Sequence, residues 1–131
     1  MSRGFHLSTR IDETRNLILF GISGQIDSAA LTDRLIAVYD KLDAPWTYDR
    51  LFDYRRADGI VDFDEIQRLA RWWHAKTGGI SYSGRVAVIV NNPLDQARVH
   101  IVAELFPFEM RGSFFTLDEA LDWLDDARKA A

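Results

Sequence analysis

The chain has 131 residues, of which 47% are hydrophobic and 27% charged, with a formal net charge of −4 and no cysteine. These values are typical of one globular domain. They exclude disulfides and thiolate sites, and the acidic balance argues against nucleic acid, anionic membranes and acidic substrates as partners. Because no secretory signal or membrane-spanning apolar run is visible, a soluble cytoplasmic protein is expected.

The N-terminal part of the chain predicts a β-hairpin. Apolar and polar residues alternate from Phe5 to Ile11, residues 12–16 form a polar turn, and residues 17–22 are almost continuously apolar. Alternation indicates a strand with one exposed face, and a continuous apolar run indicates a strand buried on both faces. The hairpin therefore has one half-exposed strand and one buried strand.

A first helix is predicted to begin at Asp27 or Ser28, either of which is a good N-cap residue, and to end before Pro45. Its apolar face consists of Leu31, Leu35, Val38 and Leu42. Residues 48–54 form the next strand.

A second helix follows, opened by Asp62 and Glu65 as a capping pair. Its inward residues are predicted to be Phe63, Ile66, Leu69, Ala70 and Trp73. Trp72 lies at the margin of that stripe and is expected to be partly covered.

The second half of the chain repeats the alternation of strand and helix. Residues 86–90 predict a strand buried on both faces, and Asn92 with Pro93 starts a third helix. The predicted inward face of this helix is Leu94, Ala97, Ile101 and Leu105.

A last strand at residues 110–115 precedes a helix opened by the capping box of Thr116 and Glu119. The resulting order is ββαβαβαβα. Strands that alternate with helices predict parallel pairing through right-handed crossovers, and the opening hairpin adds an antiparallel strand. We therefore expect residues 1–131 to form one α/β domain with a single mixed, mostly parallel sheet flanked by helices.

Three segments of this pattern carry a family resemblance: LFDYRRADG, RVAVIVNN and FFTLDEALDWLDD. Together they resemble the SpoIIAA-like family, a branch of the STAS superfamily that is also grouped with the CRAL-TRIO lipid-binding domains. The resemblance extends from about Phe5 to Asp126. It implies the STAS-type α/β fold and a regulatory role through protein partners.

One functional feature of that family has no counterpart here. STAS anti-sigma-factor antagonists carry a phosphorylatable serine or threonine at the start of the helix after the strand that matches residues 48–54. Phosphorylation there adds nearly two negative charges. In this chain the matching position falls near Asp62, and residues 48–76 contain no serine or threonine. A phosphorylation switch at this place is therefore not expected.

The sequence also lacks a recognisable catalytic pattern. His6, His74 and His100 are isolated from one another, and neither a G-x-S-x-G elbow nor a phosphate-binding loop occurs. Glycines in residues 77–84 precede a strand, whereas a phosphate cradle opens a helix. The prediction is a protein that is not an enzyme and that uses no metal or cofactor.

The turn after the strand at residues 48–54 holds the candidate binding residues, which are Asp53, Arg55, Arg56 and Asp58, with Trp72 as an aromatic anchor. Ligands of open α/β sheets favour the carboxyl ends of strands. This turn, the loop after Ile22 and the Asn91–Asn92 loop should therefore share one rim.

Two interpretations of the arginines remain open. They contact an anion or a protein partner, or they pair with nearby acidic residues and only fix the turn. The acidic residues considered are Asp58, Asp62 and Asp64.

Two functions follow from these observations. The first is a non-catalytic regulatory or protein-interaction module that binds a partner or a second copy of itself. A homodimer is one expectation, because Ile36 points away from the buried face of its helix and the first strand lies at a sheet edge. The alternative is a CRAL-TRIO-type carrier of a small apolar ligand or lipid. Its pocket would be lined by Leu105, Phe106, Phe108, Phe114 and Phe115.

Overall fold

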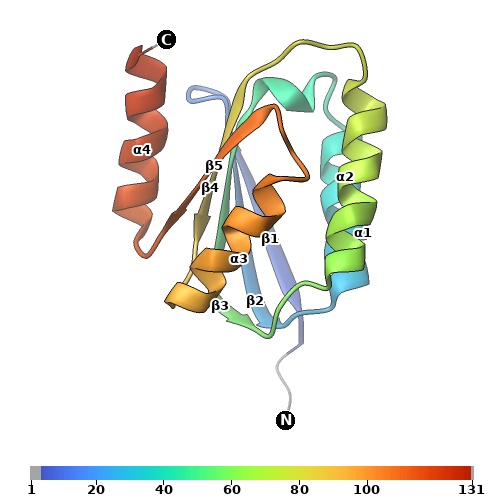
Figure 1. The fold of residues 1–131 in the computed structure, drawn as a ribbon, viewed down its shortest axis with the longest axis vertical. Coiled ribbons are helices and arrows are strands. Elements are labelled where there is room, and N and C mark those ends of the chain that lie inside the picture. Colours follow the sequence, from blue (N-terminus) through green and yellow to red (C-terminus); the bar gives the residue numbers. More distant parts are fainter. Residues whose placement is uncertain (1–3, 131) are drawn as a thin grey trace.

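The computed structural model describes residues 4–130, and its side chains from residue 4 to residue 126 (Figure 1). The strands are β1 (His6–Asp12), β2 (Leu17–Gln25), β3 (Asp49–Asp58), β4 (Gly84–Ile89) and β5 (Glu109–Phe114). The helices are α1 (Ser28–Asp40), α2 (Phe63–Thr77), α3 (Pro93–Ala103) and α4 (Leu117–Ala130), with a short 3₁₀ turn at Pro45–Thr47.

The strands form one five-stranded sheet in the order β1-β2-β3-β4-β5. β1 pairs antiparallel with β2, and every other neighbouring pair is parallel. This arrangement confirms the predicted fold class and the opening hairpin. It also leaves β1 at one edge of the sheet, as predicted.

Helices cover both faces of the sheet, but unequally. α1, α2 and α3 lie on one face, and α4 lies on the other (Figure 1). Alternate residues of each strand supply the two cores. In β4, Val86 and Val88 belong to the core under α1–α3, whereas Ala87 and Ile89 belong to the core under α4. The predicted burial of this strand on both faces is confirmed.

Three helix starts have the side-chain caps that the sequence predicts. The Asp27 carboxylate accepts from the backbone N–H of Ala30 at 3.1 Å, and the Asn92 side chain accepts from Asp95 N–H at 2.9 Å. The Thr116 hydroxyl accepts from Glu119 N–H at 3.2 Å. Each cap satisfies an N–H group that the helix itself leaves without a partner.

The predicted capping pair of α2 is wrong in its details. Asp62 occupies the N-cap position, but its side chain makes no capping hydrogen bond. The N–H of Glu65 donates to the backbone carbonyl of Asp62 at 3.0 Å, so it needs no side-chain acceptor. The Glu65 carboxylate accepts instead from Arg68 Nε at 2.7 Å. Across the two helices, Asp62 N–H donates to the Ser28 hydroxyl at 2.9 Å, which links the starts of α1 and α2.

The predicted inward face of α3 is wrong at three of its four residues, whereas the fourth, Leu105, is half-buried against the core. Leu94 and Ile101 are 64% and 58% exposed, and Ala97 is exposed too. The face that meets the sheet contains buried Val99 and half-buried Val102. Apolar residues occur all round this helix, so several apolar stripes fit its sequence and only the packing selects one. A similar error affects the first turn of α2, where Phe63 is 47% exposed.

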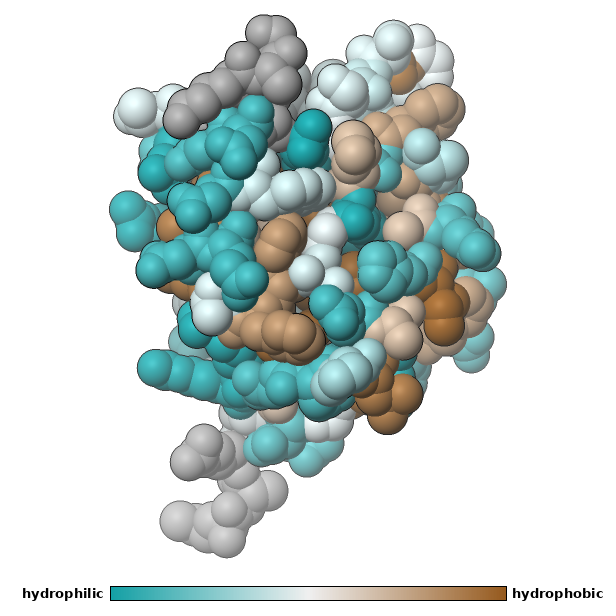
Figure 2. Space-filling model, turned by 60° about the vertical axis from the view of Figure 1, so that its left-hand side comes forward, coloured by the Kyte–Doolittle hydropathy of each residue, from teal (hydrophilic) through white to brown (hydrophobic). Residues whose placement is uncertain are grey.

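The outer surface of α4 is strongly hydrophilic, as expected for an amphipathic helix that buries one stripe. Its exposed side chains include Asp118, Glu119, Asp122 and Asp126. Figure 2 shows hydrophilic side chains gathered on this side of the molecule and apolar ones in separate patches. In the part of the chain that the structure describes, no helix is both long enough and apolar enough to cross a bilayer.

Candidate functional site

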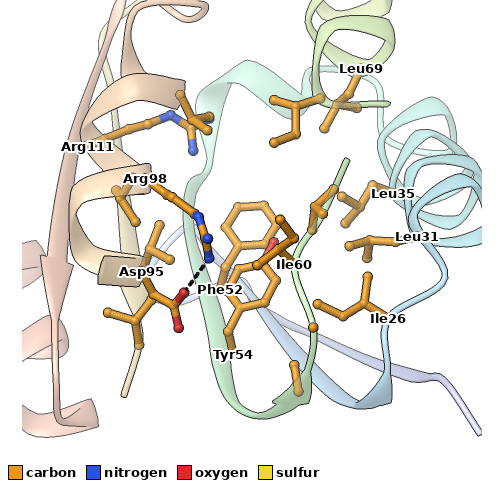
Figure 3. A pocket seen from close by; sticks show the side chains of 18 of the residues that line it. Ile26, Leu31, Leu35, Phe52, Tyr54, Ile60, Leu69, Asp95, Arg98 and Arg111 are labelled. Atoms are coloured by element: carbon orange, nitrogen blue, oxygen red, sulfur yellow. Dashed lines mark hydrogen bonds and ion pairs between the residues drawn. The ribbon is translucent and has the colours of Figure 1, made fainter. Parts of the chain in front are cut away.

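A cavity of about 370 Å³ lies on the α1–α3 face, between the α1–α2 pair and α3 (Figure 3). Strands β3 and β4 form its base. Its apolar lining includes Ile26, Leu31, Leu35, Phe52, Leu69 and Val99. A space of this size falls in the range of small-molecule pockets, roughly 300–1,000 Å³, which are mainly apolar with a few placed polar groups.

The mouth of the cavity lies at the carboxyl ends of the strands, where residues 58–61 and 91–92 border it. Two hydrogen bonds hold this rim together: Asn91 Nδ2 donates to the Arg55 carbonyl at 2.7 Å, and Ile26 N–H donates to the Asp58 carbonyl at 2.9 Å. Gly59 adopts a φ of 91°, which a side chain would resist. The ends of these segments share one rim, as predicted, but the predicted end of the strand at residue 54 is wrong. β3 continues to Asp58, so Arg55, Arg56 and Asp58 lie in the strand and not in a turn after it.

Two arginines face the deep end of the cavity from separate strands. Arg50 of β3 is opposite Val86 of β4, and Val86 is opposite Arg111 of β5. The arginines therefore occupy one row of the sheet two strands apart, and both line the cavity. Strand spacing of about 4.8 Å places their backbones roughly 10 Å from each other.

Glu109 is the acidic partner of both arginines. Its side chain is 0% exposed and forms an ion pair with Arg50, whose side chain is 3% exposed. Arg111 Nη2 lies 3.5 Å from the other carboxylate oxygen, and the Arg111 side chain is 8% exposed. The Nε atoms of Arg50 and Arg111 are buried without a hydrogen-bond partner among the described residues. This cluster thus holds two guanidinium groups and one carboxylate.

Aromatic rings enclose these charges. The Arg50 guanidinium lies 4.3 Å from the Trp73 ring centroid, and its Nη1 donates to the Tyr39 hydroxyl at 3.4 Å. The Arg111 guanidinium lies 4.3 Å from the Phe106 ring centroid. Such cation–π contacts offset part of the cost of removing a charge from water.

Burial shifts the pKa values of two neighbouring groups, Arg111 and Tyr54, in opposite directions. Burial, followed by the positive charge of Arg50, lowers the pKa of Arg111 to about 9. Burial raises the pKa of Tyr54 to about 12, although the charge of Arg111 opposes the rise. The Tyr54 hydroxyl makes no hydrogen bond to any residue that the structure describes, and its side chain lines the cavity.

A third arginine of the cavity has its own partner. Arg98 Nη1 donates to Asp95 Oδ1 at 2.9 Å, and Asn92 Nδ2 donates to the other oxygen of Asp95 at 2.9 Å. The two residues lie three positions apart on α3, and both line the cavity on the side that this helix forms (Figure 3). Because the pair contains one charge of each sign, it adds no net charge to the cavity.

Of the predicted candidate residues, Asp58 lines the cavity, and Asp53 and Arg55 of β3 pair with each other. Arg55 Nη2 and Nε donate to the two carboxylate oxygens of Asp53 at 2.8 and 3.0 Å. Burial opposes ionisation of Asp53, but the side-chain and backbone hydrogen bonds from Arg55 outweigh it and lower the Asp53 pKa. The hydrogen bond to Asp53 raises the pKa of Arg55. The partner of Arg55 is therefore Asp53, and not the later acidic residues considered from the sequence.

The remaining candidates lie in different surroundings. Arg56 is exposed and makes no ion pair or hydrogen bond with the residues that the structure describes. Asp58 borders the mouth of the cavity. Trp72 is half-buried, as predicted, with its ring stacked at 6.3 Å on Tyr39 and Lys76 5.8 Å from its centroid. It lies nine residues after the first residue of α2, roughly 13 Å along the helix from its start, whereas Arg55 and Arg56 lie in β3.

The predicted phenylalanine pocket does not form. Of its five proposed residues, only Phe106 lines the cavity. Phe114 belongs to the opposite core, 5.4 Å from the Trp123 ring, while Phe108 and Phe115 are 64% and 43% exposed. Alternation along β5 sends Phe114 to the α4 face, and the chain turns sharply on both sides of that strand.

Sequence reasoning missed Arg50, Glu109 and Arg111. A signal does exist in β3, because Arg50 shares the parity of Phe52 and Tyr54 and therefore points to the same face as these aromatic residues. A charge at a core-facing position of a strand indicates a buried polar cluster. In β5 the sequence signal is weaker. The residues that share a face with Arg111 are Glu109 and Ser113, and neither is apolar.

No group of three or more histidine, aspartate or glutamate side chains among the described residues could hold a metal ion. His74 Nε2 contacts the Leu105 carbonyl at 2.7 Å, which connects α2 to the end of α3. The arrangement is suited to holding a ligand by burial and charge.

The chain resembles solved structures, although neither a family model nor a curated protein sequence matches it. One is an uncharacterised DUF3478-family protein from Shewanella loihica PV-4 with a SpoIIAA-like fold. It is 21% identical, with 95% of this chain and 98% of that chain covered and a TM-score of 0.63. Another is an anti-sigma factor antagonist from Mycobacterium paratuberculosis, 18% identical, with 95% and 99% covered and a TM-score of 0.59. At these identities the comparisons confirm the fold.

Proposed function

We propose that this chain, a domain with the SpoIIAA-like fold, is a non-catalytic binding module that takes a small, mainly apolar ligand into its cavity. The observation that carries the proposal is the cavity of about 370 Å³ between α1–α2 and α3. The sequence alone favours a protein-interaction module. Because of the cavity, we rank ligand binding above a protein-interaction role.

Three properties of the cavity support this function. The first is its volume of about 370 Å³, which is enough to hold a small molecule. This space opens at the carboxyl ends of the strands, where ligands of α/β sheets bind. Its walls are apolar side chains from helices on both sides, which suits the hydrocarbon part of a ligand.

Native mass spectrometry of the purified protein, combined with solvent extraction and analysis of the extract, tests the proposal. We expect a bound small molecule, or uptake of an added one in a one-to-one complex. Leu69→Trp should abolish uptake, because Leu69 lines the cavity and a larger ring fills it. Leu42→Trp is the matched control, since Leu42 is also half-buried but lies outside the cavity. Equal uptake by both variants would contradict the proposal.

A protein-interaction or regulatory role is the second candidate. It is favoured by the structural likeness to an anti-sigma factor antagonist and by Arg56, an exposed arginine without a partner among the described residues. Phosphorylation at the start of α2 is not part of this candidate, because residues 48–76 contain no serine or threonine. The Asp53–Arg55 pair and Trp72 lie apart from each other, because the pair belongs to β3 and Trp72 belongs to α2.

Affinity capture with purified wild-type protein and Arg56→Glu tests this role. Loss of a specific partner in Arg56→Glu, with the partner kept in Arg71→Glu, would support a contact near the end of β3. Arg71 is the control because it is an exposed arginine on α2. Unchanged capture by Arg56→Glu and by Trp72→Phe would remove that surface from consideration.

Self-association through the edge strand β1 belongs to the same candidate. All seven residues of β1 are exposed or half-buried, and its outer backbone edge faces no other strand of the sheet. An exposed edge can pair with a second copy. Light scattering should show a dimer whose population falls in Thr9→Pro, because proline removes a backbone donor. A monomer at all concentrations would refute it.

A further inference from the structure

We propose that the ligand of the cavity is a monoanion, a single carboxylate on an apolar body, and that Arg111 is the side chain that binds the carboxylate. This inference rests on the proposed ligand-binding function. It adds the chemical class of the ligand and the residue that selects it.

The first argument is the balance of charge around the cavity. Arg50 and Arg111 line its deep end, and Glu109 is the one carboxylate in contact with them among the described residues. Arg98 is neutralised by Asp95. Asp58 borders the mouth, where its exposed side chain is screened by solvent. The deep end therefore carries one positive charge more than it carries negative charges.

The second argument is that this surplus charge is buried. Of the two arginine side chains, Arg50 is 3% exposed and Arg111 is 8% exposed. A buried charge without a counterion is strongly unfavourable, and such charges in proteins are usually paired. One added negative charge would balance the cluster, whereas a dianion would reverse the imbalance. A monoanion is therefore the matching ligand charge.

Hydrogen-bonding capacity assigns the binding role to Arg111. Glu109 forms its close ion pair with Arg50, and Arg111 has a single contact with it at the longer distance of 3.5 Å. Arg111 Nε is buried and has no acceptor among the described residues. Figure 3 shows the Arg111 side chain directed into the cavity. The guanidinium can thus offer its fork of N–H groups to a planar carboxylate.

Two neighbours complete this anion site. The Phe106 ring lies 4.3 Å from the Arg111 guanidinium and restricts its orientation. The Tyr54 hydroxyl has no partner in the described part of the chain and lines the same cavity, so it is available as a further donor. The apolar walls beyond these groups then take up a hydrocarbon body, which a bare inorganic anion would not fill.

Calorimetric titration with three probes separates charge from apolar body. The probes are decanoate, which has both, 1-decanol, which has only the body, and acetate, which has only the charge. We expect decanoate to bind about 10- to 100-fold more tightly than decanol, the factor that one charged hydrogen-bonding contact supplies. Acetate should bind far more weakly than decanoate.

Arg111→Met tests the assigned residue, with Arg71→Met as the control that removes the same charge from an exposed position. Arg111→Met should lose the preference for decanoate over decanol and keep its affinity for decanol, whereas Arg71→Met should behave as the wild type. The empty Arg111→Met protein should also unfold at a higher temperature than the empty wild type, because the uncompensated charge is gone. The comparison of probes on the wild type needs no variant and stands even if Arg111→Met does not fold.

The outcomes distinguish the two proposals. Equal binding of decanoate and decanol to the wild type would overturn the monoanion inference and leave the apolar-ligand function standing. Selectivity that persists in Arg111→Met would overturn the role of Arg111. If neither amphiphile binds and the purified protein carries no ligand, both proposals fail.

Discussion

The two faces of the sheet are built from the same strands and have opposite characters. Under α4, a compact apolar cluster includes Leu51, Ile89 and Leu124, each at most 2% exposed. Under α1, α2 and α3, the core is larger but contains the cavity and a buried charge cluster. One helix lying along the sheet closes its face. On the other face, α1 and α2 lie apart from α3 (Figure 1), and the cavity is lined from both sides.

This difference shows how one strand can serve stability and function together. In β3, Leu51 belongs to the α4 core, whereas Arg50, Phe52 and Tyr54 line the cavity. Successive side chains of a strand point to opposite faces, so a change at one residue acts on one face. The α4 face should therefore respond to substitution as an ordinary core. The cavity face should respond through its charges.

The largest expected effect is loss of the carboxylate on the cavity face. Glu109→Gln leaves Arg50 and Arg111 buried without a counterion, and breaking a buried ion pair by removing one partner typically costs about 3–5 kcal/mol. Chemical denaturation of both proteins measures the difference in unfolding free energy. The control is Glu119→Gln, an exposed residue at the start of α4. A loss at Glu109 no larger than the control would show that the cluster is not buried as described.

On the α4 face, removal of volume should be the sensitive change. Leu124→Ala should lower the unfolding free energy by about 2–5 kcal/mol, because a buried leucine leaves a void that its neighbours cannot fill. Leu69→Ala on the cavity face should cost less, since Leu69 is half-buried and already borders an open space. Equal losses at both positions would mean that the cavity face is packed as tightly as the α4 face.

The cavity face should also show an unusual phenol titration. Tyr54 has a folded-state pKa of about 12 against an ordinary value of 10.0, so its absorbance change should come late in an alkaline titration. Because the folded pKa is raised, its contribution to stability is complete below the unfolded pKa and is lost as pH rises through the folded pKa. Tyr54→Phe should remove the latest absorbance step. The difference in stability between wild type and variant should shrink between about pH 10 and 12.

The smallest effect is expected at the exposed ion pair outside both cores. Asp53→Asn should change stability at neutral pH by about 0–1 kcal/mol, as is usual for surface pairs. The pKa of Asp53 is lowered in the folded protein, so any stabilisation is present above the unfolded pKa and disappears as pH falls through the folded pKa. Unfolding curves of wild type and variant should coincide in acid. A larger neutral-pH loss would assign this pair a structural role that its exposure does not suggest.

Much of the fold follows from local sequence features. The alternation in β1, the apolar runs of β2 and β4, and the caps at Asp27, Asn92 and Thr116 are each decided by neighbouring residues. Such features predict the element order and the mostly parallel sheet. They predict less well where the local pattern is ambiguous.

The third helix is the clearest example of that ambiguity. Its residues are apolar on several sides, and Val99 is buried in place of the predicted Leu94 only because α3 packs on β5 in one particular rotation. The capping of α2 differs for a similar reason. Ser28, far away in the sequence, takes the hydrogen bond from Asp62 N–H.

By itself, the sequence determined the order of strands and helices, the place of the rim and the absence of a serine or threonine at the start of α2, because each depends on residues close together in the chain. Only the tertiary structure decided the cavity and its charge. Arg50 and Arg111 come from strands separated by β4, and they share a face with Glu109 only after the crossovers have brought β3, β4 and β5 into register. A buried charge is a property of what surrounds it, and those surroundings come from distant parts of the chain.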